Sequence, residues 1–190
     1  MIRKTEGEER KTIRFVGDTT LRKRYAVSSL GRLASFKKAI YKDGIILKGS
    51  VTAGGYKTLN LHIEKGNNSF YLHREMAKVF CKKASPMHEF VIHSNHQKMD
   101  NRVANLKWVT AEELAEHQQN SPSVIGYKHR QANREEGPKL NAKKVREIKE
   151  LLADPNRKLT YKKIAEKYKV SEMSVYRILS GENWAKIKAE

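Results

Sequence analysis

The stretch that decides the fold runs over residues 70–120 and reads FYLHREMAKVFCKKASPMHEFVIHSNHQKMDNRVANLKWVTAEELAEHQQN. Its opening part, 70–80, places apolar residues at helical spacing and predicts a helix. Two short apolar segments, 90–93 (FVIH) and 105–110 (NLKWVT), predict an antiparallel pair of strands. The Thr-x-x-Glu pattern that starts at Thr110 is a capping box, so a second helix is expected directly after the second strand. The stretch therefore predicts a ββ-hairpin followed by a helix.

Residues before this stretch carry strand signals. Aromatic and β-branched residues with rough alternation indicate strands within 12–17, 25–36, 44–51 and 56–63. Glycines and an Asp-Gly pair separate these segments and indicate turns. We expect a small antiparallel unit with one or two hairpins.

Residues after 138 predict helices. The segment 139–154 places apolar residues on one helical stripe. The pattern I-A-x-x-Y-x-V-S-x-x-S-V-x-x-I-L over 164–179 predicts a helix-turn-helix in which Ser171 caps the second helix. A plain three-helix bundle is the alternative. Trp184 is expected to pack back on these helices rather than to contact a base.

Together these patterns predict an α+β fold made of small modules. Proline, glycine and polar residues between the ββα stretch and the helices indicate a linker, either a DNA-following segment or a disordered spacer. The expected division is an N-terminal tail (1–11), a β-rich DNA-contacting module (12–66), a ββα unit (67–120), a basic linker (121–138) and a helix-turn-helix domain (139–190).

Composition indicates a polyanionic partner. The 190 residues include 39 Lys and Arg, and the formal net charge is +18. Such an excess is typical of nucleic-acid binding, and a generic basic protein such as a ribosomal one is the alternative. The single cysteine, Cys81, excludes a disulfide framework and a cysteine-based zinc cluster. The sequence shows no signal peptide and no apolar run long enough for a membrane span, so we expect an intracellular protein without membrane contact.

The stretch 70–120 resembles the HNH core of phage homing endonucleases. The residues that match the family pattern are His93, Asn101, Asn105, Leu106, Trp108, Val109 and Thr110. The segment YAVSSLGRLASF, with a later GGYKTLNL, resembles the NUMOD4-like module that precedes this core in many of these enzymes. The resemblance implies a ββα-metal nuclease scaffold on DNA, with a linker that follows the duplex. It also implies a protein of the cytoplasm of a bacterial or phage-infected cell.

The resemblance also implies where a metal would bind. HNH nucleases use one divalent cation, held by the residue before the histidine and by an asparagine six residues after the tryptophan. Here these positions are Ile92 and Leu114, which offer no oxygen to a hard cation. His93 stands at the general-base position, where without a cation it is not expected to function. We therefore expect no metal and no cofactor.

An active nickase with a rearranged site for Mg²⁺ or Mn²⁺ is the alternative. The polar residues near enough in sequence to rebuild such a site are Asn95, His96, Asp100, Glu113 and Glu116. His73 and His117 are interpreted as scaffold or phosphate-contacting groups, and Asn101 and Asn105 as residues that hydrogen-bond across the hairpin loop.

DNA contacts are expected from two regions. In the β-rich module the basic residues are Arg22, Lys23, Arg24, Arg32, Lys37 and Lys38, with a solvated strand edge as the alternative reading. In the helix-turn-helix, Lys162, Lys163 and Lys169 are expected on phosphates, and Ser171, Glu172, Met173, Tyr176 and Arg177 at the second helix, with Arg177 and Glu172 as base readers.

The leading hypothesis is a nuclease-dead, sequence-specific duplex-DNA-binding protein that acts as a regulator or blocker, as a monomer on an extended site. The competing hypothesis is the active nickase. An RNA-associated basic protein is a third option, which the helix-turn-helix pattern disfavours.

Overall fold

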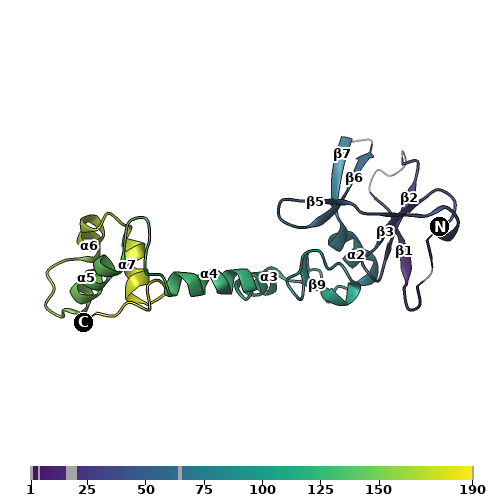
Figure 1. The fold of residues 1–190 in the computed structure, drawn as a ribbon. Helices are drawn as coiled ribbons and strands as arrows, with labels where there is room; N and C mark the ends of the chain where they lie inside the picture. Colours follow the sequence, from purple (N-terminus) through teal and green to yellow (C-terminus); the bar gives the residue numbers. More distant parts are fainter. Residues whose placement is uncertain (1, 4, 16–20, 64–65, 190) are drawn as a thin grey trace. The chain divides into compact units, whose positions relative to one another are not determined.

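The computed structural model describes residues 2–3, 5–15, 21–63 and 66–189, and it divides the chain into two compact units, Met1–Gln118 and Gln119–Glu190 (Figure 1). We call them unit 1 and unit 2. Unit 1 contains three small antiparallel sheets and helices, and unit 2 is helical, so the predicted α+β class is confirmed. Among the described residues, none of the helices combines the length and apolar character that crossing a membrane requires.

The first sheet of unit 1 has four antiparallel strands in the order β1 (Arg10–Ile13), β2 (Arg24–Ser28), β3 (Leu33–Phe36) and β4 (Ile45–Leu47). The short helix α1 (Ile40–Asp43) lies between β3 and β4. The Asp43 carboxylate accepts hydrogen bonds from the backbone N–H groups of residues 37–39, each at 2.9 Å, and so fixes the turn into α1. The strand expected over 12–17 starts two residues earlier, and residues 16–17 lie outside the described part.

The N-terminal segment differs from the expected tail. Glu8 is buried and its carboxylate accepts hydrogen bonds from Arg32 Nε at 2.9 Å and Arg32 Nη2 at 2.6 Å. The same carboxylate pairs with Arg10 at 2.8 Å. A buried carboxylate between two guanidinium groups ties this segment to β3, because removing either charge type would leave the other unpaired in the interior.

A second sheet follows, in the order β5 (Ser50–Val51), β6 (Lys57–Ile63) and β7 (Gly66–Tyr71). The sequence patterns placed Phe70 and Tyr71 in a helix. In the structure they end β7, where Phe70 pairs with Leu59 and Tyr71 with Thr58. Cross-strand partners that are distant in sequence therefore override the helical spacing, and the helix α2 begins only at Leu72.

The hairpin and helix predicted from residues 90–120 are confirmed. Strands β8 (Phe90–His93) and β9 (Leu106–Val109) pair in antiparallel fashion, and a 3₁₀ turn, η2 (Val103–Asn105), leads into β9. Helix α3 (Ala111–Gln119) follows at once. Its capping box is present, because Thr110 N donates to Glu113 Oε2 at 3.0 Å and Glu113 N donates to Thr110 Oγ1 at 3.3 Å.

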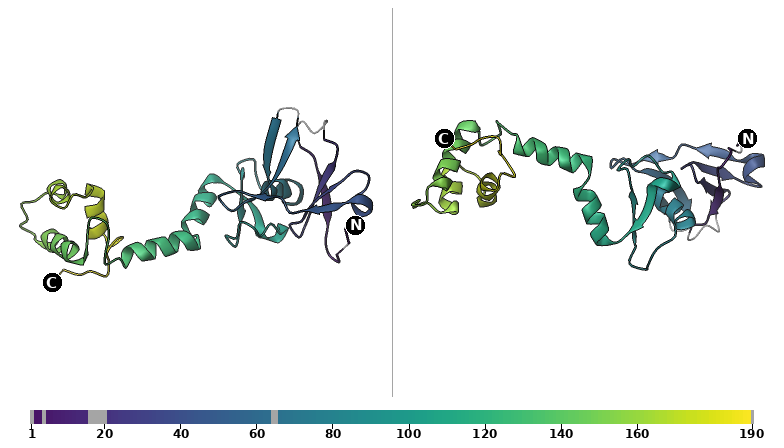
Figure 2. Two further views of the ribbon diagram at one scale, coloured as in Figure 1. Left: turned by 45° about the horizontal axis from the view of Figure 1, so that its top comes forward. Right: turned by 90° about the horizontal axis from the view of Figure 1, so that it is seen from below.

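The sheets and the ββα element of unit 1 share one hydrophobic core. Helix α2 (Leu72–Phe80) packs against β6, β7 and β9 (Figure 2). Trp108 Nε1 donates to the Ala77 carbonyl at 3.1 Å, which fastens β9 to α2. The core residues are Ile13, Phe15, Val27, Leu33, Leu59, Leu61, Leu72, Met76 and Leu106. Modules of this size bury little surface alone, and a shared core increases what each buries.

Unit 2 contains α4 (Pro122–Ala132), α5 (Ala142–Ala153), α6 (Tyr161–Lys167) and α7 (Glu172–Leu179). Helix α4 occupies most of the segment expected to be an irregular linker. Ser121 caps it by accepting from Val124 N at 3.4 Å, and Pro122 stands in the first turn, where its missing N–H costs nothing.

The core of unit 2 is formed by one face of each of α5, α6 and α7. Its buried residues are Leu140, Val145, Ile148, Ile164, Ala165, Val175, Ile178 and Trp184. The expected core position of Trp184 is thus confirmed. Ser171 caps α7 as expected by accepting from Ser174 N at 3.2 Å. Lys169, in the turn before α7, has a left-handed backbone with φ of 55°.

Gly31, in the turn between β2 and β3, approaches the loop between β8 and β9. Its φ is 80°, and a Cβ there would lie 2.9 Å from the backbone carbon of Asn101. Nearby, Val103 N donates to the Ser29 carbonyl at 3.0 Å. The glycine of the YxVSxxGR element is therefore required by two constraints, a left-handed conformation and close backbone packing.

We predict that Gly31→Ala lowers the free energy of unfolding by more than the ~1 to 2 kcal/mol expected for an L-residue in the left-handed region alone. Gly7→Ala is the matched control, because Gly7 has a φ of 70° and a Cβ added there would meet nothing within 4 Å. Urea unfolding of both variants measures the difference. Equal losses would show that the contact with Asn101 carries no energetic weight.

Candidate functional site

His93, the last residue of β8, is the centre of the candidate site. Its side chain is buried, and its Nε2 lies 3.2 Å from Asn101 Oδ1. An amide oxygen only accepts hydrogen bonds, so Nε2 must carry the proton and Nδ1 is left as the nitrogen able to take one. This arrangement suits a histidine that acts as a base.

The loop after His93 is held by Asn105. The Asn105 amide oxygen accepts from Asn95 N at 3.0 Å, and its Nδ2 donates to Asn95 Oδ1 at 2.9 Å and to the Asp100 carbonyl at 2.8 Å. Asn101 also donates to the Met99 carbonyl, at 3.2 Å. The expected hydrogen bonds of Asn101 and Asn105 across the loop are therefore present, and they orient His93.

Aromatic rings surround His93 on one side. The His73 ring lies 5.0 Å from the His93 ring, and the Tyr56 ring lies 5.1 Å from His73 and 6.0 Å from His93, between centroids. Lys98 places its ammonium 4.7 Å from the Tyr56 centroid and donates to the Gly54 carbonyl at 2.9 Å. The β5–β6 turn is thereby joined to the loop that follows β8.

Burial keeps both central histidines neutral. It lowers the pKa of His73 to about 3, with smaller contributions from His93 and Arg74. Burial also lowers the pKa of His93, although the Asn101 hydrogen bond and Asp100 act in the opposite direction. The His73 Nδ1 atom is buried without a hydrogen-bond partner, as suits an uncharged scaffold imidazole.

His117 and His96 lie beside the same strand end. His117 Nε2 donates to the His93 carbonyl at 3.0 Å, which connects α3 to β8. The His96 ring stacks on His117 with centroids 3.9 Å apart, and His96 has a left-handed backbone with φ of 60°. His117 therefore acts as a scaffold group in this structure.

The two positions at which the resemblance implies metal ligands hold half-buried aliphatic side chains. Ile92 lies on β8, paired with Lys107 of β9, and Leu114 lies in the first turns of α3. Neither side chain has an oxygen, and a hard divalent cation requires oxygen ligands. Within the described ranges, three or more His, Cys, Asp or Glu side chains do not gather anywhere in a way that could hold a metal ion. The residues at this position do not match the cation that the family uses.

The polar residues that could rebuild a shifted site have other partners. The Asp100 carboxylate accepts from Arg102 at 2.8 and 2.7 Å, which with Asn95 holds the pKa of Asp100 far below its usual range. Asn95 is bonded to Asn105 and Asp100. Glu113 serves the capping box and lies 3.5 Å from Lys107. Glu116 is exposed on α3.

The basic residues predicted in the β-rich module fall into two groups. Arg32 binds Glu8, and Arg24 donates to the carbonyls of Lys37 and Lys38 while its guanidinium lies 4.8 Å from the Phe36 centroid. These two arginines hold the fold of the module. The others, Arg22, Lys23, Lys37 and Lys38, are exposed.

One surface of unit 1 was not identified from the sequence. The ribbon of β6 and β7 exposes a ladder of polar side chains that bond across the strands. His62 Nδ1 lies 2.9 Å from Asn67 Oδ1, Ser69 donates to Asn60 Oδ1, and Asn60 Nδ2 donates to Ser50 Oγ at 3.4 Å. Amide groups on a ribbon of strands offer a donor and an acceptor that complement the acceptor and donor of an adenine edge. The polar residues of NLHI (60–63) and NNSF (67–70) were the sequence signal from which this surface could have been predicted.

In unit 2 the predicted residues gather around α7. Lys162 and Lys163 on α6, Lys169 in the turn, and Glu172, Met173, Tyr176 and Arg177 on α7 are all exposed. Ser171 is occupied as the helix cap. Arg177 Nε lies 3.5 Å from Glu182 Oε2, so this guanidinium is shared with a carboxylate.

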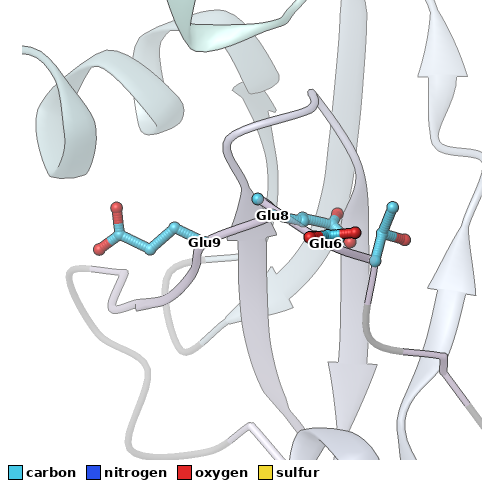
Figure 3. A pocket seen from close by; sticks show the side chains of 5 residues that line it. Glu6, Glu8 and Glu9 are labelled. Carbon is cyan, nitrogen blue, oxygen red and sulfur yellow. The ribbon is translucent and has the colours of Figure 1, made fainter.

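Unit 1 also has an open hollow, which lies directly before β1. It is lined by Thr5, Glu6, Gly7, Glu8 and Glu9. Figure 3 shows Glu9 directed away from Glu6 and Glu8. Its acidic lining does not suit a polyanion, and its one buried carboxylate, Glu8, is already neutralised by Arg10 and Arg32.

We predict that acid weakens unit 1 through His73. Because its folded pKa is about 3 against an ordinary value of 6.5, only the unfolded chain binds a proton between these values, and stability falls as pH drops below about 6.5. The slope is about 1.4 kcal/mol per pH unit, so wild type should lose about 2 to 3 kcal/mol more than His73→Phe between pH 7 and 4.5. Urea unfolding at both values tests this. His62→Gln, at an exposed histidine, should behave as wild type, and an unchanged pH dependence in His73→Phe would contradict the assignment.

Comparison with known proteins adds three findings. The family model of the NUMOD4 motif matches residues 8–62. An uncharacterized HNH endonuclease, L247 of Acanthamoeba polyphaga mimivirus, is 34% identical over 96 residues, which is 50% of this chain and 23% of that protein. This chain therefore spans about a quarter of that relative's length.

The solved structure described as "DNA binding and cleavage by the HNH homing endonuclease I-HmuI" aligns with a TM-score of 0.47 and 22% identity, over 92% of this chain and 91% of that one. The NUMOD4 match ends before β8, and it includes the YAVSSLGR segment whose turn contains Gly31. The chain therefore carries the NUMOD4 motif over residues 8–62 and is similar in sequence to an HNH endonuclease.

Proposed function

We propose that this chain is a sequence-specific duplex-DNA-binding protein derived from an HNH homing endonuclease, that it does not cut DNA, and that it acts as a regulator or blocker at its site. The observation that carries the proposal is a contrast within the ββα element formed by β8, β9 and α3. His93 and its Asn101 hydrogen bond are intact, whereas both family metal positions are aliphatic, Ile92 and Leu114.

Charge and surface chemistry support DNA as the partner. The chain has a net charge of +18, and exposed lysines and arginines occur in both units. Phosphate contacts by such residues give affinity without sequence preference. The polar ribbon of β6 and β7 and the exposed face of α7 are the surfaces that offer groups able to read bases.

The proposed loss of cleavage follows from the missing oxygen ligands for a cation. Phosphodiester hydrolysis needs far more acceleration than the ~10² to 10⁴-fold that one general base supplies. The family obtains the rest from a cation, which Ile92 and Leu114 cannot hold. The alternative, a nickase with a shifted metal site, is weakened because Asn95, Asp100 and Glu113 are committed to structural hydrogen bonds and ion pairs.

The first test is the salt dependence of binding. Six phosphate contacts would lower affinity for duplex DNA by about 10³-fold between 50 and 200 mM salt. Removing two of them with Lys162→Ala and Lys163→Ala should reduce the slope of log K against log salt by about two. Fluorescence anisotropy with specific and random duplexes measures both. Lys188→Ala, an exposed lysine of the same unit outside the predicted set, is the control and should change the slope little. If RNA competes for the protein more strongly than duplex DNA does, the RNA-associated alternative is favoured.

The second test restores the metal ligands. With Mg²⁺ or Mn²⁺, the unmodified chain should leave supercoiled plasmid carrying its site intact. The double variant Ile92→Asp with Leu114→Asn should gain cation-dependent nicking near the site, because it returns an oxygen to each family position beside an intact His93. Each single variant should gain much less.

Adding His93→Ala to the double variant is the control and should abolish the nicking. Circular dichroism and DNA binding of each variant show whether the hairpin and α3 still fold. Nicking by the unmodified chain would overturn the proposal and support the shifted-site alternative.

A further inference from the structure

Helix α7 exposes an unusual amount of apolar surface for its length. Over eight residues it presents Met173, Tyr176 and Leu179, which are 58%, 43% and 50% exposed. Its two fully buried residues, Val175 and Ile178, already attach it to the core of unit 2. The exposed set, which we call the α7 apolar patch, lies outside this buried core. Contiguous exposed apolar side chains indicate a contact surface.

Tyr176 is held in position before any partner binds. Its ring stacks on Tyr161 with centroids 4.5 Å apart, and the Arg157 guanidinium lies 4.3 Å from the centroid of Tyr161, the first residue of α6. Tyr161 itself packs against the core. A side chain fixed in this way loses little conformational entropy when it makes a contact.

The basic side chain of the same helix is paired with a carboxylate. The α7 apolar patch is therefore the main surface of this helix that is left to contact bases. Arg177 shares its charge with Glu182 at 3.5 Å. Unit 2 as a whole is cationic, since residues 119–190 include 17 Lys and Arg and nine Asp and Glu. An apolar strip on a unit with this excess of positive charge matches a polyanion that also presents apolar groups.

We propose that α7 reads thymine 5-methyl groups in the major groove of duplex DNA through Met173 and Tyr176, with Leu179 extending the patch. This inference rests on the proposed DNA-binding function and names its specificity. The thymine methyl is the apolar group of the major groove, and it distinguishes A·T from G·C pairs by contact with apolar side chains. The sequence pattern alone assigned base reading to Arg177 and Glu172.

The experiment compares thymine with deoxyuridine, which lacks only the methyl group. Duplexes are first selected from a random pool by the full-length chain. Each thymine of the selected site is then replaced singly by deoxyuridine, and affinity is measured by anisotropy. We expect one cluster of thymines at which the replacement weakens binding by about four-fold per methyl group, as one buried CH₂ implies.

Variants assign the effect to α7. In Met173→Ala and in Tyr176→Ala the deoxyuridine penalty at part of this cluster should disappear. Tyr176→Phe should retain it, because the ring remains. Met87→Ala, which truncates a methionine of unit 1 that is 70% exposed, is the matched control and should retain every penalty.

The outcomes separate this inference from the proposed function. Failure to bind any duplex would overturn the proposed function. Selective binding without a deoxyuridine penalty, or with a penalty unchanged in both alanine variants, would overturn only the thymine reading. A dimer in solution that Met173→Ala disrupts would assign the patch to a second copy of the chain and would also overturn it.

Discussion

The loop between β8 and β9 holds unit 1 together. Asn105 fastens the two sides of this loop with three hydrogen bonds, and Asn101 places the proton of His93 on Nε2. From the other side, the β2–β3 turn presses against the same loop, with Gly31 so close to Asn101 that a side chain would not fit. The position of His93 therefore depends on a hairpin more than sixty residues earlier in the chain, which explains why the sheets and the ββα element share one core.

This dependence gives a physical reason for the polar network to be kept whether or not the site holds a metal. His93, Asn101 and Asn105 are buried and belong to one hydrogen-bonded loop, so replacing any one leaves a buried partner without a hydrogen bond. Ile92 and Leu114 are only half-buried, and aliphatic side chains there leave no polar group unpaired. Stability thus protects the histidine network independently of catalysis, and a preserved histidine is weak support for activity.

In the proposed interface with DNA, different chemical groups supply affinity and selectivity. Exposed lysines of both units supply attraction that any duplex would satisfy. Selectivity then needs groups that match base edges, and the structure offers two different kinds, the amides of the β6–β7 ribbon and the apolar patch of α7. Several of the arginines that composition suggests for DNA contacts are used internally, since Arg32 neutralises Glu8 and Arg24 holds the following turn.

Features that short-range rules control could be predicted from the amino-acid order. The β8–β9 hairpin, the capping box at Thr110, the Ser171 cap and the apolar stripes of α5, α6 and α7 all follow from spacings of two to four residues. Tertiary packing was needed to place Phe70 and Tyr71 in a strand and to bury Glu8. The helix α4 has local signals, because a serine cap and a first-turn proline outweigh the glycine and polar residues that suggested irregular backbone. The strand pairing of Phe70 and Tyr71 and the ion pair between Glu8 and Arg32 have no local signal. Both join residues that are far apart in the chain, so the order of neighbouring residues does not reveal them.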